Sequence, residues 1–178
     1  MKNMRPLGPL LSSIALVLAL TSPAQSTETS VPIPTHSNRT CQQAVDFVGR
    51  ELASKGAFAP FNTHVVPGGR VEPRVSIENG NFSQHYHSYP TNRPQQVKFI
   101  LSGDAERLWL GVMSSPQFLT TLASQIMAAC PKVGLVDYQH WWESHVPVGY
   151  FADGTARAFS WVDYDDPRRT QWGYYYSP

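Results

Sequence analysis

The 178-residue sequence has few cysteines, little net charge and no long hydrophobic run. Its longest mainly apolar run, Leu10 to Leu20, is about half the length of roughly 20 residues that a membrane-spanning helix needs. The formal net charge is only +1, which argues against a nucleic-acid binder and against a polybasic attachment to lipid. The two cysteines, Cys41 and Cys130, lie too far from the N-terminus to carry a lipid anchor.

Motifs of the common enzyme classes are also missing. The chain has no Gly-x-Ser-x-Gly nucleophile elbow, no phosphate-binding P-loop and no dinucleotide-binding glycine fingerprint. The sequence therefore favours a non-enzymatic protein, and it names no cofactor.

The N-terminus has the pattern of a secretory signal. Lys2 and Arg5 precede the apolar run, and small residues at Ser22 and Ala24 suit a signal peptidase. We predict a signal peptide over 1–24, a flexible Ser/Thr/Pro-rich leader over 25–39 and a single globular domain over 40–178. The expected location is secreted or periplasmic.

An exported chain with two cysteines most simply forms one disulfide. Cys41 opens a predicted helix over 41–55, which Thr40 and Gln43 begin as a capping box. Cys130 closes a second predicted helix that begins at Ser115-Pro116. The bridge would clamp the start of one helix to the end of the other.

The remaining segments have strand-like patterns. Asn79-Gly80 is a strong signal for a two-residue hairpin, and Asp153-Gly154 is read in the same way. The second turn sets a register in which Val148 and Phe159 share the core face. We predict an α+β fold with helices packed on one face of a mainly antiparallel sheet. The expected strands are 74–78, 81–87, 96–101, 133–138, 145–152 and 155–164.

The stretch from Ser115-Pro116 through Cys130-Pro131 to Asp137-Tyr138, followed by Asp153-Gly154 and an aromatic-rich strand, resembles a group of small exported bacterial proteins. These proteins are uncharacterised α+β domains. The resemblance covers roughly the last 65 residues, and it implies a bacterial exported domain without an attached activity.

One candidate metal site lies on the predicted first hairpin. His85 and His87 would share one strand face, with Glu72 opposite His87. Two imidazoles and a carboxylate suit zinc. The alternative is a solvated polar face, which strand alternation produces without any ligand.

Aromatic residues are concentrated after Asp137, where 12 of the 21 in the chain are found. Core packing accounts for some of them, but strand alternation sends adjacent Trp141 and Trp142 to opposite faces. Exposed Trp and Tyr rings suit stacking on a sugar or gripping a peptide. The candidate binding residues are Trp141, Trp142, Tyr150, Phe151 and Trp172.

Three functions are compatible with these patterns. The leading hypothesis is an exported, non-enzymatic domain that recognises an envelope glycan or protein through its aromatic-rich C-terminal half. The second is a small hydrolase that depends on a metal at the histidines or on a carboxylate pair, Asp137 and Glu143. The third is a purely structural domain.

Overall fold

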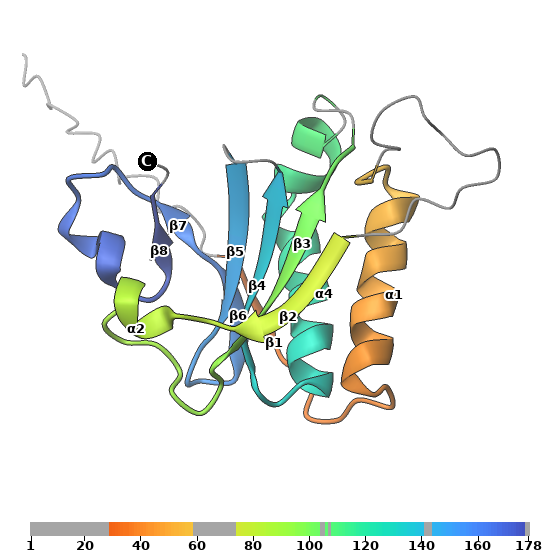
Figure 1. Cartoon of the computed structure of the whole chain (residues 1–178), viewed down its shortest axis with the longest axis horizontal. Coiled ribbons are helices and arrows are strands. Elements are labelled where there is room, and N and C mark those ends of the chain that lie inside the picture. The colour runs from red at the N-terminus through yellow and green to blue at the C-terminus, as the bar shows by residue number, and fades with distance from the viewer. Residues whose placement is uncertain (1–28, 59–73, 104–105, 107, 141–143, 177–178) are drawn as a thin grey trace, which may run out of the picture.

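The computed structural model describes residues 29–58, 74–103, 106, 108–140 and 144–176. Within them lie helices and a six-stranded sheet with a small two-stranded one (Figure 1). None of the described helices is long and apolar enough to cross a lipid bilayer. The elements are β1 (Ser30–Pro32), α1 (Cys41–Ser54), β2 (Arg74–Asn79), α2 (Phe82–His85), β3 (Gln95–Leu101), η1 (Leu108–Met113), α4 (Pro116–Ala129), β4 (Val133–His140), β5 (Ser144–Tyr150), β6 (Thr155–Ala158), β7 (Ser160–Trp161), η2 (Pro167–Thr170) and β8 (Tyr174–Tyr175).

The main sheet has the strand order β1-β6-β5-β4-β3-β2. Only the β3–β4 pair is parallel, and helix α4 connects these two strands, as a parallel crossover requires. All other neighbours in this sheet are antiparallel. The predicted α+β class, with a mainly antiparallel sheet, is confirmed.

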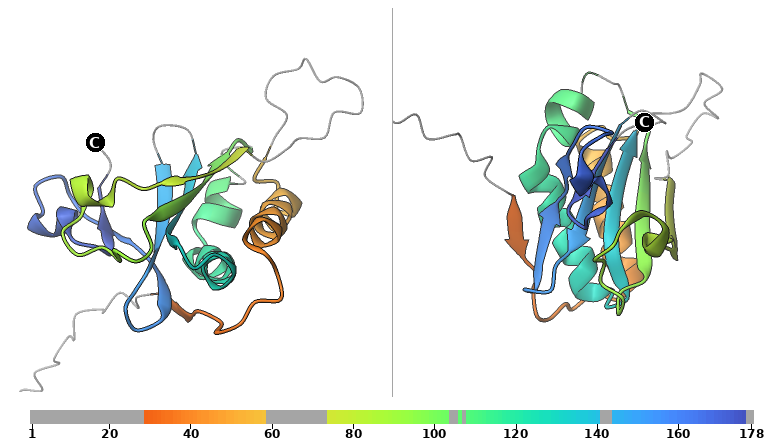
Figure 2. Two further views of the ribbon diagram at one scale, coloured as in Figure 1. Left: turned by 60° about the horizontal axis from the view of Figure 1, so that its bottom comes forward. Right: turned by 90° about the vertical axis from the view of Figure 1, so that its left-hand side faces the viewer.

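Helices α1 and α4 cover one face of the main sheet (Figure 2). Helix α1 begins with the predicted capping box, in which Thr40 accepts from the Gln43 amide and Gln43 accepts from the Thr40 amide. Both helices bury an apolar stripe against the sheet, which supplies alternate residues of β3 and β4. The core includes Val45, Val48, Leu52, Val97, Phe99, Leu119, Ile126, Met127, Val136 and Tyr138.

The predicted disulfide is present. Cys41 and Cys130 are bonded, with their Cα atoms 4.7 Å apart, and they join the first residue of α1 to the residue after α4. Arg93 holds the same end of α4, since its guanidinium donates to the carbonyl oxygens of Met127 and Val133, each at 3.1 Å. The C-terminal end of α4 is therefore held by the disulfide and by the Arg93 guanidinium.

The hairpin predicted at Asn79-Gly80 is wrong. Strand β2 pairs instead with β3, and the Gly80 amide donates to the Pro94 carbonyl at 2.8 Å. Residues after Gly80 form the short helix α2, because this path buries the Phe82 ring to 3% exposure among other aromatic side chains. Burial of a phenylalanine outweighs the local preference of a two-residue turn.

The register predicted for the last hairpin is wrong by one residue. The Phe151 N–H donates to the Thr155 carbonyl, so the turn has three residues, 152–154, inside this pair. Gly154 is in the left-handed region at φ 79°, and Val148 pairs with Ala158. Val148 therefore faces the helices together with Ala156 and Ala158. Phe159 is buried on the opposite side of the sheet.

The predicted mobile leader also differs from the structure. Residues Ser30–Pro32 form β1, which pairs with the edge strand β6, and Ile33 packs against the core. The paired part of the fold thus begins before Thr40. The predicted signal peptide lies outside the described residues.

A second, smaller layer lies on the face of the sheet opposite the helices (Figure 2). We call it the aromatic lobe; it consists of α2, β7, η2 and β8. Phe82, Phe159 and Trp172 form its buried cluster with Leu135 of the sheet. The lobe approaches β5 at Gly149, where an added Cβ would lie 2.3 Å from the Phe159 ring and 3.0 Å from Trp172.

Candidate functional site

A cleft of about 730 Å³ lies between the sheet and the aromatic lobe. Its size is within the range of ligand-binding pockets. Strands β2 to β5 and the lobe supply its lining. The cleft is thus on the sheet face that the long helices leave uncovered.

Strand alternation explains why the floor of the cleft is polar. On β4, Val136 and Tyr138 are buried in the helix-facing core, while Asp137 and Gln139 line the cleft. Strand β3 does the same, with Val97 in the core and Lys98 in the cleft. The sheet is therefore apolar on one face and offers hydrogen-bonding groups on the other.

Asp137 and His145 form a pair in this floor. The His145 Nδ1 atom lies 3.3 Å from Oδ1 of Asp137, on the neighbouring strand. The contact does not have hydrogen-bond geometry, so this buried oxygen has no hydrogen-bond partner in the described structure. The side chain of Asp137 is 13% exposed and that of His145 is 30% exposed.

A buried carboxylate oxygen without a partner is costly, because it has lost water and gained nothing in return. A carboxylate beside a histidine nitrogen also orients the imidazole, as acid–base sites do.

Tyrosine rings form the wall above this pair. The Tyr175 ring meets the His145 ring edge to face, with centroids 4.8 Å apart. Burial raises the pKa of Tyr86 to about 12, with smaller contributions from the charge of Asp137 and from Tyr176. Burial, and then the charge of Asp137, also raises the pKa of Tyr175. The phenols thus stay protonated donors at neutral pH.

At the other end of the floor, Glu78 is held by two neighbours. Its Oε1 atom accepts from Gln96 at 2.6 Å and lies 3.2 Å from the ammonium of Lys98. The hydrogen bond with Lys98, followed by that with Gln96, lowers the pKa of Glu78. Lys98 is also the register neighbour of Asp137, yet its ammonium lies with Glu78.

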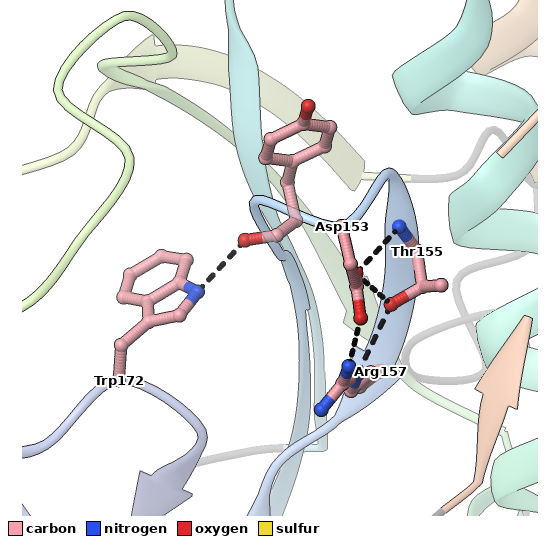
Figure 3. A network of polar contacts seen from close by, with 5 residues as sticks. Asp153, Thr155, Arg157 and Trp172 are labelled. Carbon is pink, nitrogen blue, oxygen red and sulfur yellow. Dashed lines mark hydrogen bonds and ion pairs between the residues drawn. The ribbon is translucent and has the colours of Figure 1, made fainter. Parts of the chain in front are cut away.

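Three of the predicted binding residues meet at a different place. Tyr150, Phe151 and Trp172 line a second pocket of about 640 Å³. The Trp172 indole is only 8% exposed and donates its N–H to the Tyr150 carbonyl at 2.9 Å (Figure 3). Arg93 lies over the Tyr150 ring, at 4.0 Å from its centroid. Phe151 and Trp172 pack in the lobe, whereas the Tyr150 ring packs against the helix-facing core.

The loop beside Trp172 is braced by its own polar contacts. Asp153 accepts from the hydroxyl of Thr155 at 2.6 Å and pairs with Arg157, as Figure 3 shows. Arg157 in turn lies 4.6 Å from the Phe151 ring centroid. This side of the lobe is therefore rigidly supported, which favours a structural role for Phe151.

The strand predicted to carry the metal ligands His85 and His87 is not formed. His85 ends helix α2, whereas His87 lies in the loop after it and uses its backbone N–H to bond the Thr170 carbonyl. Glu72 lies outside the described residues. In the part of the chain that is described, no group of three His, Cys, Asp or Glu side chains could hold a metal ion.

Trp141, Trp142 and Glu143 also lie outside the described residues, so their predicted roles stay predictions. Sequence reasoning missed His145, Tyr86 and Tyr175 as site residues. The alternation of apolar and polar side chains in 133–140 was a usable signal, because it places Asp137 and Gln139 on one face. That this face would be concave followed only from the position of the lobe.

Comparisons with protein-family models, with curated proteins and with solved structures found no match. We therefore infer the function of the chain from the geometry of the cleft.

Proposed function

We propose that this exported domain binds a glycan of the cell envelope in the cleft between the sheet and the aromatic lobe. The observation that carries the proposal is the composition of the cleft: phenol rings on one wall and amide and carboxylate side chains on its floor. Sugar rings present flat C–H faces edged by hydroxyl groups. Tyrosine rings stack on such faces, and amides and carboxylates hydrogen-bond the hydroxyls.

The two polar ends of the floor suit an extended ligand. Gln96 and Glu78 lie at one end, and Asp137 and His145 lie on the next strands across. A peptide could also use such groups, but the cleft is lined mainly by polar side chains and offers no deep apolar anchor pocket, which protein interfaces use as hot spots.

The hydrolase alternative has one supporting feature, the Asp137–His145 pair. Its predicted partner Glu143 is outside the described residues. The pair alone supplies a base but neither a nucleophile nor a second acid for glycosidic cleavage. Binding is therefore the function that the cleft supports best.

Isothermal titration with neutral tetrasaccharides tests the proposal. The panel is cellotetraose, mannotetraose and fully N-acetylated chitotetraose. A stacked ring contributes about 0.5–1.5 kcal/mol, so we expect Tyr175→Ala to weaken the bound tetramer by about two- to tenfold.

The matched control is Trp109→Ala, since the aromatic side chain of Trp109 is 49% exposed and does not line the cleft. This variant should bind like the unaltered protein. Equal weakening by both variants, or no binding across the panel, would contradict the proposal.

A further inference from the structure

The charges of the cleft are unevenly paired. Glu78 has the Lys98 ammonium at 3.2 Å and an amide donor at 2.6 Å. Among the described residues, Asp137 has only His145 within ion-pair distance, and no lysine or arginine nitrogen lies there. One carboxylate in the cleft is thus paired with a lysine, and the other is not.

The remaining cation of the cleft is engaged elsewhere. The Arg169 guanidinium donates to the Tyr164 carbonyl and lies 4.6 Å from the Tyr164 ring centroid and 5.8 Å from that of Tyr176. It is thus held by the outer edge of the aromatic lobe. Asp137, in contrast, lies on the floor with its side chain 13% exposed.

The surroundings of Asp137 suit an organic cation. Aromatic faces attract ammonium groups through their quadrupole, and Tyr86 and Tyr175 both line the cleft with this carboxylate. Partial burial strengthens a charge-assisted hydrogen bond, since water competes less for the carboxylate. Oδ1 of Asp137 is buried beside His145, so a ligand would reach this carboxylate through the part of its side chain that is exposed.

We infer that the cleft takes a glycan carrying a protonated amino group, whose ammonium is bound by Asp137 under the tyrosine wall. This inference rests on the proposed function and narrows its ligand to amino sugars. Lys98 is the register neighbour of Asp137, and its positive charge repels the ammonium of the ligand. Glu78 limits that repulsion by holding the Lys98 ammonium.

The test compares two tetramers with the same backbone by isothermal titration at pH 7. One is fully deacetylated glucosamine tetramer, and the other is its N-acetylated counterpart, which carries no charge. A hydrogen bond to a charged group is worth about 1.5–3 kcal/mol, so we expect the deacetylated tetramer to bind at least about tenfold more tightly.

Three variants should change the preference for the deacetylated tetramer in different directions. Asp137→Asn should abolish the preference for the deacetylated tetramer. Lys98→Met should increase it, because a competing cation is removed. Glu78→Gln should decrease it, because Lys98 is then free to pair with Asp137. Asp165→Asn is the control, since Asp165 is exposed and does not line the cleft.

Each outcome decides the inference. Equal affinity for both tetramers, or an unchanged preference in Asp137→Asn, would overturn the amino-sugar inference. If the N-acetylated tetramer still binds, the glycan proposal stands. If neither tetramer binds, both the amino-sugar inference and the use of this cleft for such sugars are overturned. Circular dichroism of each variant checks that the fold is retained.

Discussion

Removal of the Cys41–Cys130 disulfide should cost much of the stability of this domain. The bond spans a sequence separation of 89 residues. For a loop of about this length, the chain-entropy relation gives about 4.6 kcal/mol at 25 °C. Domains of this kind have a free energy of unfolding of about 5–15 kcal/mol, so the loss is a large fraction of the total.

The assay is urea unfolding of the oxidised protein, the reduced protein and the Cys41→Ala/Cys130→Ala double variant. The reduced protein separates the cross-link from packing, because Cys130 is itself buried, at 2% exposure. We expect both open forms to lose about 4–5 kcal/mol, with a modest further difference between them. A loss below about 2 kcal/mol in the reduced protein would refute the loop-entropy reasoning.

Hydrogen exchange adds a spatial test of the same perturbation. The disulfide ties α1 to α4, whereas β4, β5 and β6 are joined to one another by sheet hydrogen bonds. Amides of α1 should therefore lose protection before those of the three strands. Equal loss of protection everywhere would contradict the view of the bond as a clamp on α1.

Three further predictions concern the lobe and the core. The Tyr86 phenol has a pKa of about 12 in the folded state and about 10 when unfolded, so the unfolded state loses its proton first and stability falls as pH rises from 10 to 12. Urea unfolding at pH 9 and pH 12 should show a fall that is about 2 kcal/mol smaller in Tyr86→Phe, and an identical fall would contradict the burial of this phenol. Tyr138→Phe removes the buried hydrogen bond to the Leu119 carbonyl, which is 3.0 Å long. The domain should lose about 1 kcal/mol of stability in thermal unfolding. No change in stability would mean that the bond is not made. Gly149→Ala should lower the folding stability by about 1–3 kcal/mol, because the new methyl group meets the Phe159 ring. It should also alter the near-ultraviolet circular dichroism of Trp172. An unchanged spectrum would argue against the close contact of the lobe with this glycine.

Sequence patterns predicted the helical layer well because its signals are local. The capping pair at Thr40 and Gln43 and the Ser115-Pro116 start lie within a few residues of the helices they begin. The pairing of Cys41 with Cys130 followed from their number and the expected compartment. No tertiary information was needed for these features.

The errors arose where distant residues decide the path of the chain. Asn79-Gly80 has the local signal for a hairpin, but Phe82 is buried by contacts that include Trp172, far along the sequence. The last hairpin has a three-residue loop instead of two, which moved Phe159 from the expected core to the lobe. The cleft depends on both features, so its lining could not be assembled from local patterns.

The aromatic residues that first suggested a binding surface have divided roles. Trp172 and Phe159 are buried in the lobe, with ring centroids 5.0 Å apart, and serve packing. Tyr86 and Tyr175 pack against the buried cluster of the lobe and also line the cleft. The excess of aromatic residues is therefore mainly the means by which a second layer is attached to the sheet, and the cleft is its consequence.

The most direct test of the central claim is a ¹H–¹⁵N NMR titration with the tetramer that binds most tightly. Binding in the cleft should shift the amides of Lys98, Asp137 and His145 and leave those of Tyr150 to Ala152, at the second pocket, nearly unchanged. Shifts confined to Tyr150 to Ala152, or to the helices on the far face, would contradict the assignment of the cleft as the binding site.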